Sequence, residues 1–388
     1  MLGLSRRTQA DEPFVEIERA ATISMRELAI ASIAPNTTLT VSKKEALAHS
    51  AVIACLDILC GAHSQTPIDV VRTQRDKRTP IEPQPLVIST PSAMVTQDVW
   101  HTQIAFSIHT DGNAFAIVAA TDRLGFPTQL ETIDPSVVED RKVEDGIPTV
   151  KIGSDVHKLW PHGDIWHVPG RLVPAGQPWG ISPLQAASEA IGIGLAASRF
   201  SGRFLRDGGM PPIMLSVTSA TTPETIQKVK AQWRNLLLGN REPVVMSGDI
   251  KAEKLAFNPE EMEFDQTAQF IVQEICRFLF VPPPMVFAAM SGQSVTYANL
   301  SQSDSAFLKY SLAVPMGRVE RALSAILPDG QNVKWNFAAF LRADTVTRYG
   351  SYDVALRNGW LNVNEVRALE DLPPIPGGDV YQTSGGQS

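Results

Sequence analysis

The sequence lacks several features that mark common functional classes. Only three of its 388 residues are cysteines, which excludes a disulfide-stabilised scaffold and indicates a reducing compartment. No glycine is followed by a lysine, so the usual phosphate-binding loop of nucleotide hydrolases is missing. The longest uncharged stretch, 278–303, contains three consecutive prolines and a polar Ser-Gly-Gln-Ser run, so it cannot form a spanning helix. The first residues also lack the apolar core of a signal peptide, and a soluble intracellular chain is expected.

The composition describes a folded chain of ordinary hydrophobicity. Apolar residues make up 44% and charged residues 19%, which is typical of globular proteins and excludes a mostly disordered chain. The length is enough for two or three domains. The net charge of −7 argues against a protein that grips nucleic acid with a broad basic face.

The N-terminal part of the chain, up to Gly170, has a mixed α+β pattern. Apolar spacing predicts helices over 43–64 and 95–109, and strands over 66–71, 114–120 and 129–133. The stretch 72–92 is rich in proline and polar side chains and is expected to form a loop. Short strands with tight turns are expected from 134 to 170. The pattern indicates a few helices packed on small antiparallel sheets.

A helix crowded with small residues is predicted next. Ser182 and Pro183 form a typical helix start, and the helix extends to about Asp207. Two glycines inside it, Gly192 and Gly194, cost about 1 kcal/mol each relative to alanine. We expect close packing of a neighbouring helix, within or between subunits, to offset that cost.

A small αβ segment separates this helix from a second long one. Its predicted elements are a strand over 213–217, a helix from 222 to about 239, and a strand pair over 244–246 and 250–257. The second long helix is predicted over 259–280, where three prolines end it. An uncharged polar loop then leads to a helix over 297–327, in which Pro315 should introduce a kink. A strand over 332–337, a helix over 348–356, the segment 359–367 and a proline- and glycine-rich tail complete the chain.

Three evenly spaced histidines are the best candidates for a metal site. His157, His162 and His167 could ligate a metal if loops brought them together, but their spacing matches neither a helix face nor a strand face. Surface or internally bonded histidines near strand ends explain the pattern better. Neighbouring cysteines Cys55 and Cys60 are interpreted as buried small hydrophobes. No catalytic or metal-ligating residue and no cofactor is assigned.

A basic stripe lies on the small-residue helix. Arg199, Arg203 and Arg206 fall on one side of it at three- and four-residue spacing. The stripe is either an ordinary solvated face or a local basic patch at a subunit interface or along a phosphate path. The spacing alone does not decide between these alternatives.

The order of these elements, together with several short motifs, resembles the portal proteins of tailed bacteriophages, in particular the family typified by phage HK97. The resemblance covers 45–380 or so, and its specificity comes from the order and spacing of the motifs. They are Ser50–Cys55, Pro67–Val70, Asp111–Phe115, Gly125–Pro127, Gly180–Leu184, Val281–Pro283, Leu312–Glu320, Gly359–Arg367 and Pro373–Asp379. One departure is Leu300-Ser301-Gln302, where the family often carries a Glu or Gln pair.

The resemblance implies a ring, usually of twelve copies, at one vertex of an icosahedral capsid. It implies an α+β portal fold with an α/β wing, long stem helices, a small αβ clip and a kinked channel-lining helix. The implied divisions are a wing (1–182), a first stem helix (183–209), a clip (210–258), a second stem helix (259–283), a tunnel loop (284–298), a kinked helix with a return to the wing (299–350) and a short C-terminal crown or tail (351–388).

The resemblance also implies partners and channel residues. The ring would pass double-stranded DNA and would contact the major capsid protein, the terminase large subunit and a head–tail adaptor, with no membrane involved. It would be assembled in the host cytoplasm and end in the virion of a phage, a prophage or a gene transfer agent. ATP chemistry would belong to the terminase. Uncharged channel-facing residues are expected around the tunnel loop: Ser291, Gln293, Ser294, Thr296, Tyr297 and Asn299.

Two other functions remain as alternatives. One is a metal-dependent hydrolase that uses the three spaced histidines. The other is a different capsid-associated ring, such as an adaptor, although adaptors are usually much shorter.

Overall fold

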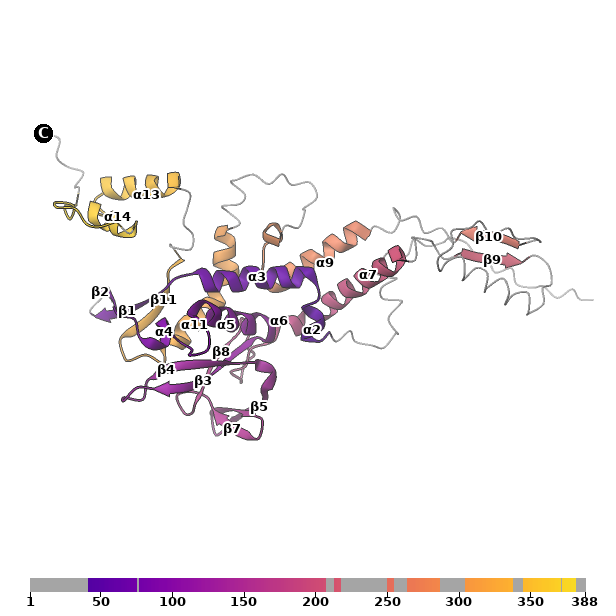
Figure 1. Ribbon diagram of the computed structural model, residues 1–388, viewed down its shortest axis with the longest axis horizontal. Helices are drawn as coiled ribbons and strands as arrows, with labels where there is room; N and C mark the ends of the chain where they lie inside the picture. Colours follow the sequence, from indigo (N-terminus) through magenta and orange to yellow (C-terminus); the bar gives the residue numbers. More distant parts are fainter. Residues whose placement is uncertain are drawn as a thin grey trace, which may run out of the picture. The chain divides into compact units, whose positions relative to one another are not determined.

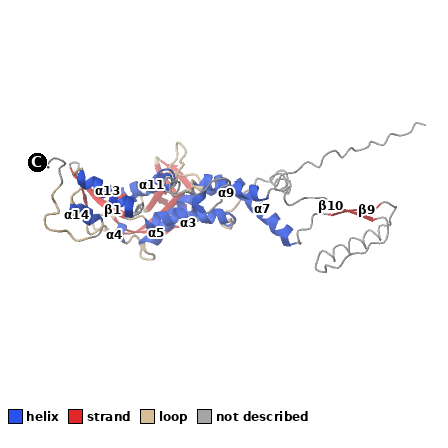
Figure 2. Cartoon of the chain, turned by 90° about the horizontal axis from the view of Figure 1, so that it is seen from above, coloured by secondary structure: helices blue, strands red, loops and turns tan. Residues whose placement is uncertain are grey.

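The computed structural model describes residues 41–74, 77–206, 213–217, 250–254, 264–286, 304–337, 345–370 and 372–381 (Figure 1). The chain divides into two compact units. One combines 1–53, 185–278 and 287–290, and the other combines 54–184, 279–286 and 291–388. Helices and strands occur in both, and the mixed α and β class predicted from the sequence is confirmed (Figure 2).

Three small antiparallel sheets form the larger unit. Their strands are β1 (Ile68–Gln74), β2 (Lys77–Pro80), β3 (Asn113–Thr121), β4 (Pro127–Ile133), β5 (Val138–Glu144), β6 (Ile147–Ile152), β7 (Asp155–Lys158), β8 (Ile165–Pro169) and β11 (Gln331–Trp335). The strand orders are β11-β1-β2, β4-β3-β8 and β5-β6-β7. Because β11 pairs with β1 from Ile68 to Arg72, a segment from much later in the chain completes the first sheet.

Helices and short helical turns accompany these sheets. They are α4 (Leu86–Ser89), α5 (Gln97–Asp111), η1 (Pro135–Val137), α6 (Pro183–Ala186), η2 (Pro283–Val286), the π-helical segment η3 (Phe307–Leu312) and α11 (Ala313–Ser324). The helix α5 packs on β3, and its buried Trp100 donates a hydrogen bond to the Leu130 carbonyl at 2.8 Å.

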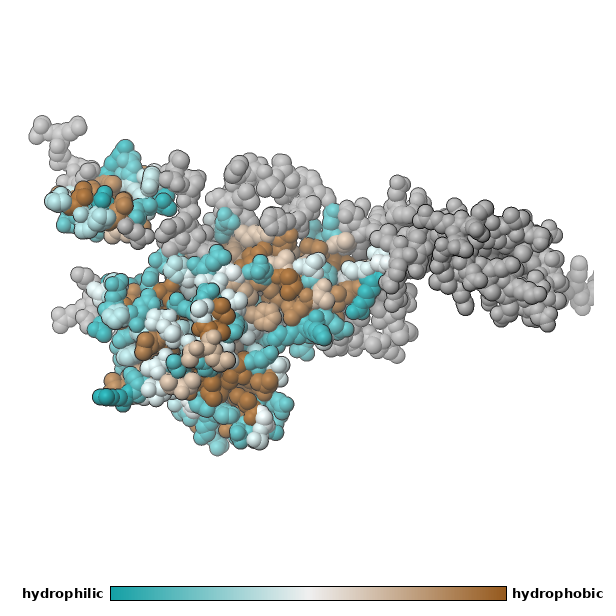
Figure 3. Space-filling view, viewed as in Figure 1, coloured by the Kyte–Doolittle hydropathy of each residue, from teal (hydrophilic) through white to brown (hydrophobic). Residues whose placement is uncertain are grey.

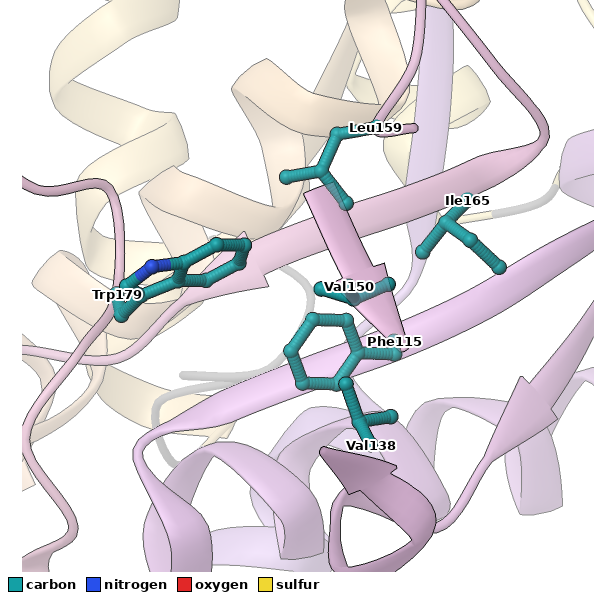
Figure 4. Packing of buried hydrophobic residues seen from close by; sticks show 6 residues of the cluster. All are labelled: Phe115, Val138, Val150, Leu159, Ile165 and Trp179. Atoms are coloured by element: carbon teal, nitrogen blue, oxygen red, sulfur yellow. The ribbon is translucent and has the colours of Figure 1, made fainter. Parts of the chain in front are cut away.

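Part of the hydrophobic core lies where two of the sheets meet. Figure 4 shows side chains from β3, β5, β6 and β8 gathered around the Phe115 ring. The cluster consists of the buried residues Phe115, Val138, Val150, Leu159, Ile165 and Trp179. Burying one such side chain contributes about 1.5–3 kcal/mol, so the cluster is a substantial part of the unit's stability.

Helices dominate the described part of the smaller unit. They are α2 (Lys43–Ala46), α7 (Ser188–Arg206) and most of α9 (Phe264–Leu279), with the strands β9 (Ile213–Val217) and β10 (Ile250–Lys254). A capping box starts α2, because Ser42 and Glu45 bond each other's backbone N–H groups. The strands β9 and β10 form an antiparallel ribbon, which is drawn in red in Figure 2.

Two details of the sequence prediction need correction. The helix predicted over 43–64 is two helices, α2 and α3 (Ser50–Gln65), which break at 47–49. The loop predicted over 72–92 contains β2 and α4, because β1 offers a free edge and Val87 and Ile88 bury their side chains. The strand β10 pairs with β9, and the strand predicted over 244–246 lies outside the described residues.

The C-terminal helices and the tail after them are joined by side-chain hydrogen bonds. The helices are α13 (Thr345–Arg357) and α14 (Val363–Leu369), and Asn362 caps α14. The Asn364 amide bonds both backbone groups of Ile375 and also bonds Asp379, so the proline-rich tail lies against α14. Figure 3 shows brown apolar surface on this segment, and its exposed apolar residues include Trp360.

Candidate functional site

Three glycines bring separate segments of the larger unit into backbone contact. A Cβ on Gly112 would lie 2.1 Å from the carbonyl oxygen of Ile181, and one on Gly180 would lie 2.0 Å from the carbonyl oxygen of Gly112. A Cβ on Gly170 would lie 2.8 Å from that same Gly112 oxygen. Gly112 also has a φ of +69°, which an L side chain rarely adopts. Only glycine therefore fits this glycine junction between α5, β8 and the segment before α6.

Asn113 binds this junction together from a completely buried position. Its side-chain amide donates to the Gly180 carbonyl at 2.9 Å and accepts from the Gly180 N–H at 2.8 Å. His167 Nε2 lies 3.0 Å from the same amide oxygen. Two of the motifs that carried the resemblance, 111–115 and 180–184, thus meet at one buried polar network.

Two tryptophan side chains bind α11 to the sheets through hydrogen bonds. Trp166 on β8 donates its indole N–H to the Ala322 carbonyl at 3.0 Å, and Trp335 on β11 donates to the Met316 carbonyl at 2.9 Å. Both tryptophans are buried. The helix predicted to carry the kink is therefore held at two points along its length.

The irregularity of this helix is a π-helical segment ahead of Pro315. The segment η3 precedes α11, and Pro315 is buried in the first turn of α11. In an α-helix each N–H bonds the carbonyl four residues earlier, and a proline in the interior removes one such bond and crowds that carbonyl. For Pro315 the carbonyl in question belongs to Ser311. The π-helical segment thus lies directly ahead of the proline at which the sequence predicted a kink.

Arg171 and Ser311 connect η3 to Phe280, the residue that follows α9. Arg171 Nη2 donates to the Ser311 carbonyl at 2.5 Å, and its guanidinium carbon lies 4.2 Å from the centroid of the Phe280 ring. The Ser311 hydroxyl donates to the Phe280 carbonyl. Arg318 on α11 donates to the carbonyls of Gly170 and Arg171. Burial lowers the pKa of Arg171, and the Arg318 charge lowers it further.

Sequence reasoning missed the Arg171–Ser311 contact. Its two residues are 140 positions apart, and each is unremarkable alone. A signal was nevertheless available, because Pro315 cannot donate the α-helical hydrogen bond that the Ser311 carbonyl would otherwise accept.

The small-residue helix has the close neighbours that its glycines predicted. A Cβ on Gly194 of α7 would lie 2.6 Å from His49 Nε2 and 2.8 Å from Ile271 Cγ2 on α9. Burial lowers the pKa of His49, which is held at this contact. The close packing expected for Gly194 is therefore confirmed within the chain.

The three arginines of the predicted basic stripe can be placed only in part. All three lie on α7, and the Arg199 side chain is exposed. Hydrogen bonds from Ser42 lower the pKa of Glu45 on α2, and the Arg199 charge contributes to that shift. The side chains of Arg203 and Arg206 lie outside the described residues. Arg199 thus has an acidic neighbour, and the stripe remains open to both interpretations.

The predicted channel residues cannot be placed. Ser291, Gln293, Ser294, Thr296, Tyr297 and Asn299 all lie outside the described residues. The described chain reaches Val286 on one side of this segment and resumes at Asp304 on the other.

The structure does not assemble the evenly spaced histidines into a metal site. His157 contacts Asp164 at 3.1 Å, whereas His167 stacks on Phe115 at 4.8 Å between ring centroids. Within the described ranges, no group of three potential ligands could hold a metal. The hydrolase alternative therefore loses the observation that suggested it. Cys55 and Cys60 are buried, as predicted, and Cys276 is buried too; none of the three forms a disulfide. Burial raises the pKa of Cys60 to about 12.

A different group of histidines is buried beside Trp335 on β11. His63 lies 5.7 Å from His109 and 6.1 Å from Trp335, and His101 lies 5.1 Å from Trp335 (ring centroids). The Nε2 atoms of His63, His101 and His109 have no hydrogen-bond partner. Sequence spacing gave no sign of this cluster, because α3, α5 and β11 are separate in the chain.

No helix in the described part of the chain is long and apolar enough to cross a bilayer.

Comparisons with known proteins agree on one family. The family model described as "Phage portal protein" matches residues 50–371. The "Probable portal protein" of Streptomyces phage phiC31 is 29% identical over 362 residues, which cover 87% of this chain and 78% of that protein. The "Portal protein" of Enterobacteria phage HK97 is 24% identical over 352 residues, covering 85% and 80% of the two chains. A chain in the "Neck of native GTA particle computed with C12 symmetry" has a similar fold, with a TM-score of 0.57 at 21% identity, covering 90% of this chain and 99% of that one.

Proposed function

The chain belongs to the phage portal protein family, and on that premise we propose that it forms a twelve-membered ring at one vertex of a capsid. The observation that carries the proposal is the family match over residues 50–371, which includes the glycine junction, the stem helices and the kinked helix. The twelvefold symmetry of the structurally similar gene transfer agent neck supports the stoichiometry. The particle is a virus, a prophage product or a gene transfer agent.

The ring would act as the conduit for double-stranded DNA during packaging and ejection. We assign the clip, 210–258, to docking of the terminase motor and later of the head–tail adaptor, and the wing, 1–182, to contact with the capsid protein. Assembly takes place in the host cytoplasm. The chain acts as a structural component, and ATP hydrolysis belongs to the terminase.

Electrostatics fit a conduit that does not bind its cargo tightly. Twelve copies at −7 each carry about −84, so the ring repels DNA broadly. The uncharged side chains from Ser291 to Asn299 would offer only weak hydrogen bonds to a moving phosphate backbone. Any attraction to the duplex is local, and the stripe of Arg199, Arg203 and Arg206 is the candidate for it.

Vertex labelling tests the main proposal. The chain with an affinity tag is produced together with the capsid proteins of its own genome, and the particles are labelled with gold against the tag. We expect label at one vertex per particle. Label at all vertices, or none on particles that assemble and package normally, would contradict a portal role.

A deletion tests the tunnel-loop assignment separately. Removal of 286–298 should leave rings of normal size, because the packed core described above does not include these residues. DNA packaging or retention in the resulting particles should fall. Rings that package and retain DNA normally would rule out the tunnel-loop assignment while leaving the portal role intact.

A further inference from the structure

We propose that Arg171 and Ser311 act together as a latch. Their side chains stabilise the π-helical bulge of the kinked helix and join the two ends of the segment between Phe280 and Ser311. Within the proposed function, on which the functional part of this inference rests, that segment carries the tunnel loop. Arg171 is then a positioning residue for the channel, although it lies in the loop after β8.

The Ser311 carbonyl lacks its α-helical hydrogen-bond donor. Pro315 has no N–H, so the Ser311 carbonyl cannot receive its α-helical hydrogen bond. Ser311 is only 2% exposed, and an unpaired buried carbonyl is unfavourable. The Arg171 guanidinium takes the place of the missing N–H at 2.5 Å. A charged donor makes a stronger bond than the backbone amide it replaces.

Arg171 and Ser311 both contact Phe280. This residue directly follows α9 and has a φ of +58°, a backbone conformation that is uncommon for a bulky residue. Its carbonyl accepts from the Ser311 hydroxyl, and its ring lies under the Arg171 guanidinium at 4.2 Å. Both contacts hold Phe280 in this conformation. The same two side chains, Arg171 and Ser311, therefore fix both ends of the segment between Phe280 and Ser311.

Arg318 holds the backbone around Arg171 in place. Arg318 donates to the carbonyl oxygens of Gly170 and Arg171, the latter at 3.1 Å. Because Arg318 belongs to α11, the helix that follows the bulge also holds the backbone that carries the latch. Gly170 is part of the glycine junction, so the latch is anchored to a closely packed part of the larger unit.

The π-helical bulge and the joined ends of the segment therefore depend on the Arg171 guanidinium. Without it, the Ser311 carbonyl loses its charged donor and the Phe280 ring loses the cation above it. The helix could then regularise or open locally, and the start and end of the segment would no longer be tied. We expect the loss to be local, because Trp166 and Trp335 still fasten α11 farther along.

Hydrogen exchange measures this local opening. In the full-length chain, Arg171→Met should accelerate exchange in a peptide covering 304–316 by roughly 10- to 100-fold, the range expected for loss of a charge-assisted hydrogen bond. A peptide covering β3 should be unchanged. Ser311→Ala, which removes the bond to Phe280 alone, should have a smaller effect in the same peptide.

Arg141 provides a matched control. Its guanidinium carbon lies 5.2 Å from the Phe115 ring centroid, and its Nη2 donates to the Pro135 carbonyl at 3.2 Å. It is therefore another half-buried arginine that combines an aromatic ring with a carbonyl, and its contacts lie away from the kinked helix. Arg141→Met should leave exchange in 304–316 unchanged.

Pro315→Ala separates the latch from ordinary packing. Alanine supplies the N–H that proline lacks, so the Ser311 carbonyl regains a donor when Arg171 is replaced. In the Pro315→Ala background, Arg171→Met should accelerate exchange in 304–316 by less than about 3-fold, compared with ~10- to 100-fold in the original chain. Equal acceleration in both backgrounds would overturn the latch, as would an equal response of 304–316 to Arg141→Met.

Particle assays distinguish the latch from the proposed function. If the exchange results hold and Arg171→Met also reduces DNA packaging or retention, the latch and the channel assignment are both supported. If the exchange results hold but packaging is normal, the latch remains and its role in positioning the channel is overturned.

Discussion

Four histidines packed in the interior should make the protein sensitive to mild acid. His63, His101 and His109 form the buried cluster beside Trp335, and each has an unpartnered ring nitrogen. The fourth, His167, is packed between the rings of Phe115 and Trp179. A protonated imidazole at any of these positions would be a charge held away from water, which is unfavourable.

Burial lowers the pKa of each group. The pKa of His101 falls to about 4, and those of His109 and His167 fall to about 3; that of His63 falls well below its usual value. Nearby charges modify these shifts: Asp98 raises the pKa of His101, whereas Arg171 and Arg141 lower those of His109 and His167.

The sign and size of the effect follow from proton linkage. An unfolded histidine titrates near pH 6.5, so below that pH the unfolded chain binds protons that the folded chain does not. The stability is therefore fully present above pH 6.5 and is lost as the pH falls toward the folded pKa values. At pH 5.5 each histidine removes roughly 1.4 kcal/mol, so the three with numerical values remove about 4 kcal/mol and His63 adds to this. That is a large fraction of a typical stability of about 5–15 kcal/mol.

Urea unfolding at pH 7.5, 6.5 and 5.5 tests this expectation. Tryptophan fluorescence is a suitable probe because two of the histidines contact Trp335. Protein concentration and ionic strength are held constant, because assembly also depends on them. His101→Gln should reduce the loss of unfolding free energy between pH 7.5 and pH 5.5 by about 1.4 kcal/mol. Equal free energies of unfolding at pH 7.5 and 5.5 would show that burial does not lower the pKa of these histidines.

Two further predictions compare identical glycine-to-alanine changes at crowded and open positions. Gly112→Ala should lower the free energy of unfolding by more than ~3 kcal/mol, because its Cβ meets the Ile181 carbonyl. Gly125 also has a positive φ but has nothing within 4 Å of the Cβ position, so Gly125→Ala should lower the free energy of unfolding by only about 1–2 kcal/mol. Gly194→Ala should destabilise the chain, because side chains of neighbouring segments occupy the space. Gly202 lies in the same helix with open space around its Cβ position, so Gly202→Ala should stabilise the chain by about 0.5–1 kcal/mol. Chemical denaturation of all four variants measures these differences.

Local patterns were enough to locate many elements. The helix predicted over 95–109 is α5, and the strand predicted over 213–217 has the bounds of β9. Glycines inside the small-residue helix correctly predicted a close neighbour at Gly194. Period and turn signals depend on adjacent residues, so they can be read without knowing the fold.

Features that depend on distant segments were not predictable in the same way. The strand β2 forms because β1 has a free edge, and β10 pairs with β9 although the two strands are not adjacent in the chain. The contact of Arg171 with Ser311 and the histidine cluster arise only when separate elements pack together. A single sequence shows which residues are apolar or charged, but not which of them meet.

Electron microscopy of the purified chain shows directly whether it assembles as a portal ring. We expect closed rings with a central channel and twelvefold symmetry, either alone or after the capsid protein is added. Persistent monomers under all assembly conditions, including with capsid protein, would contradict it.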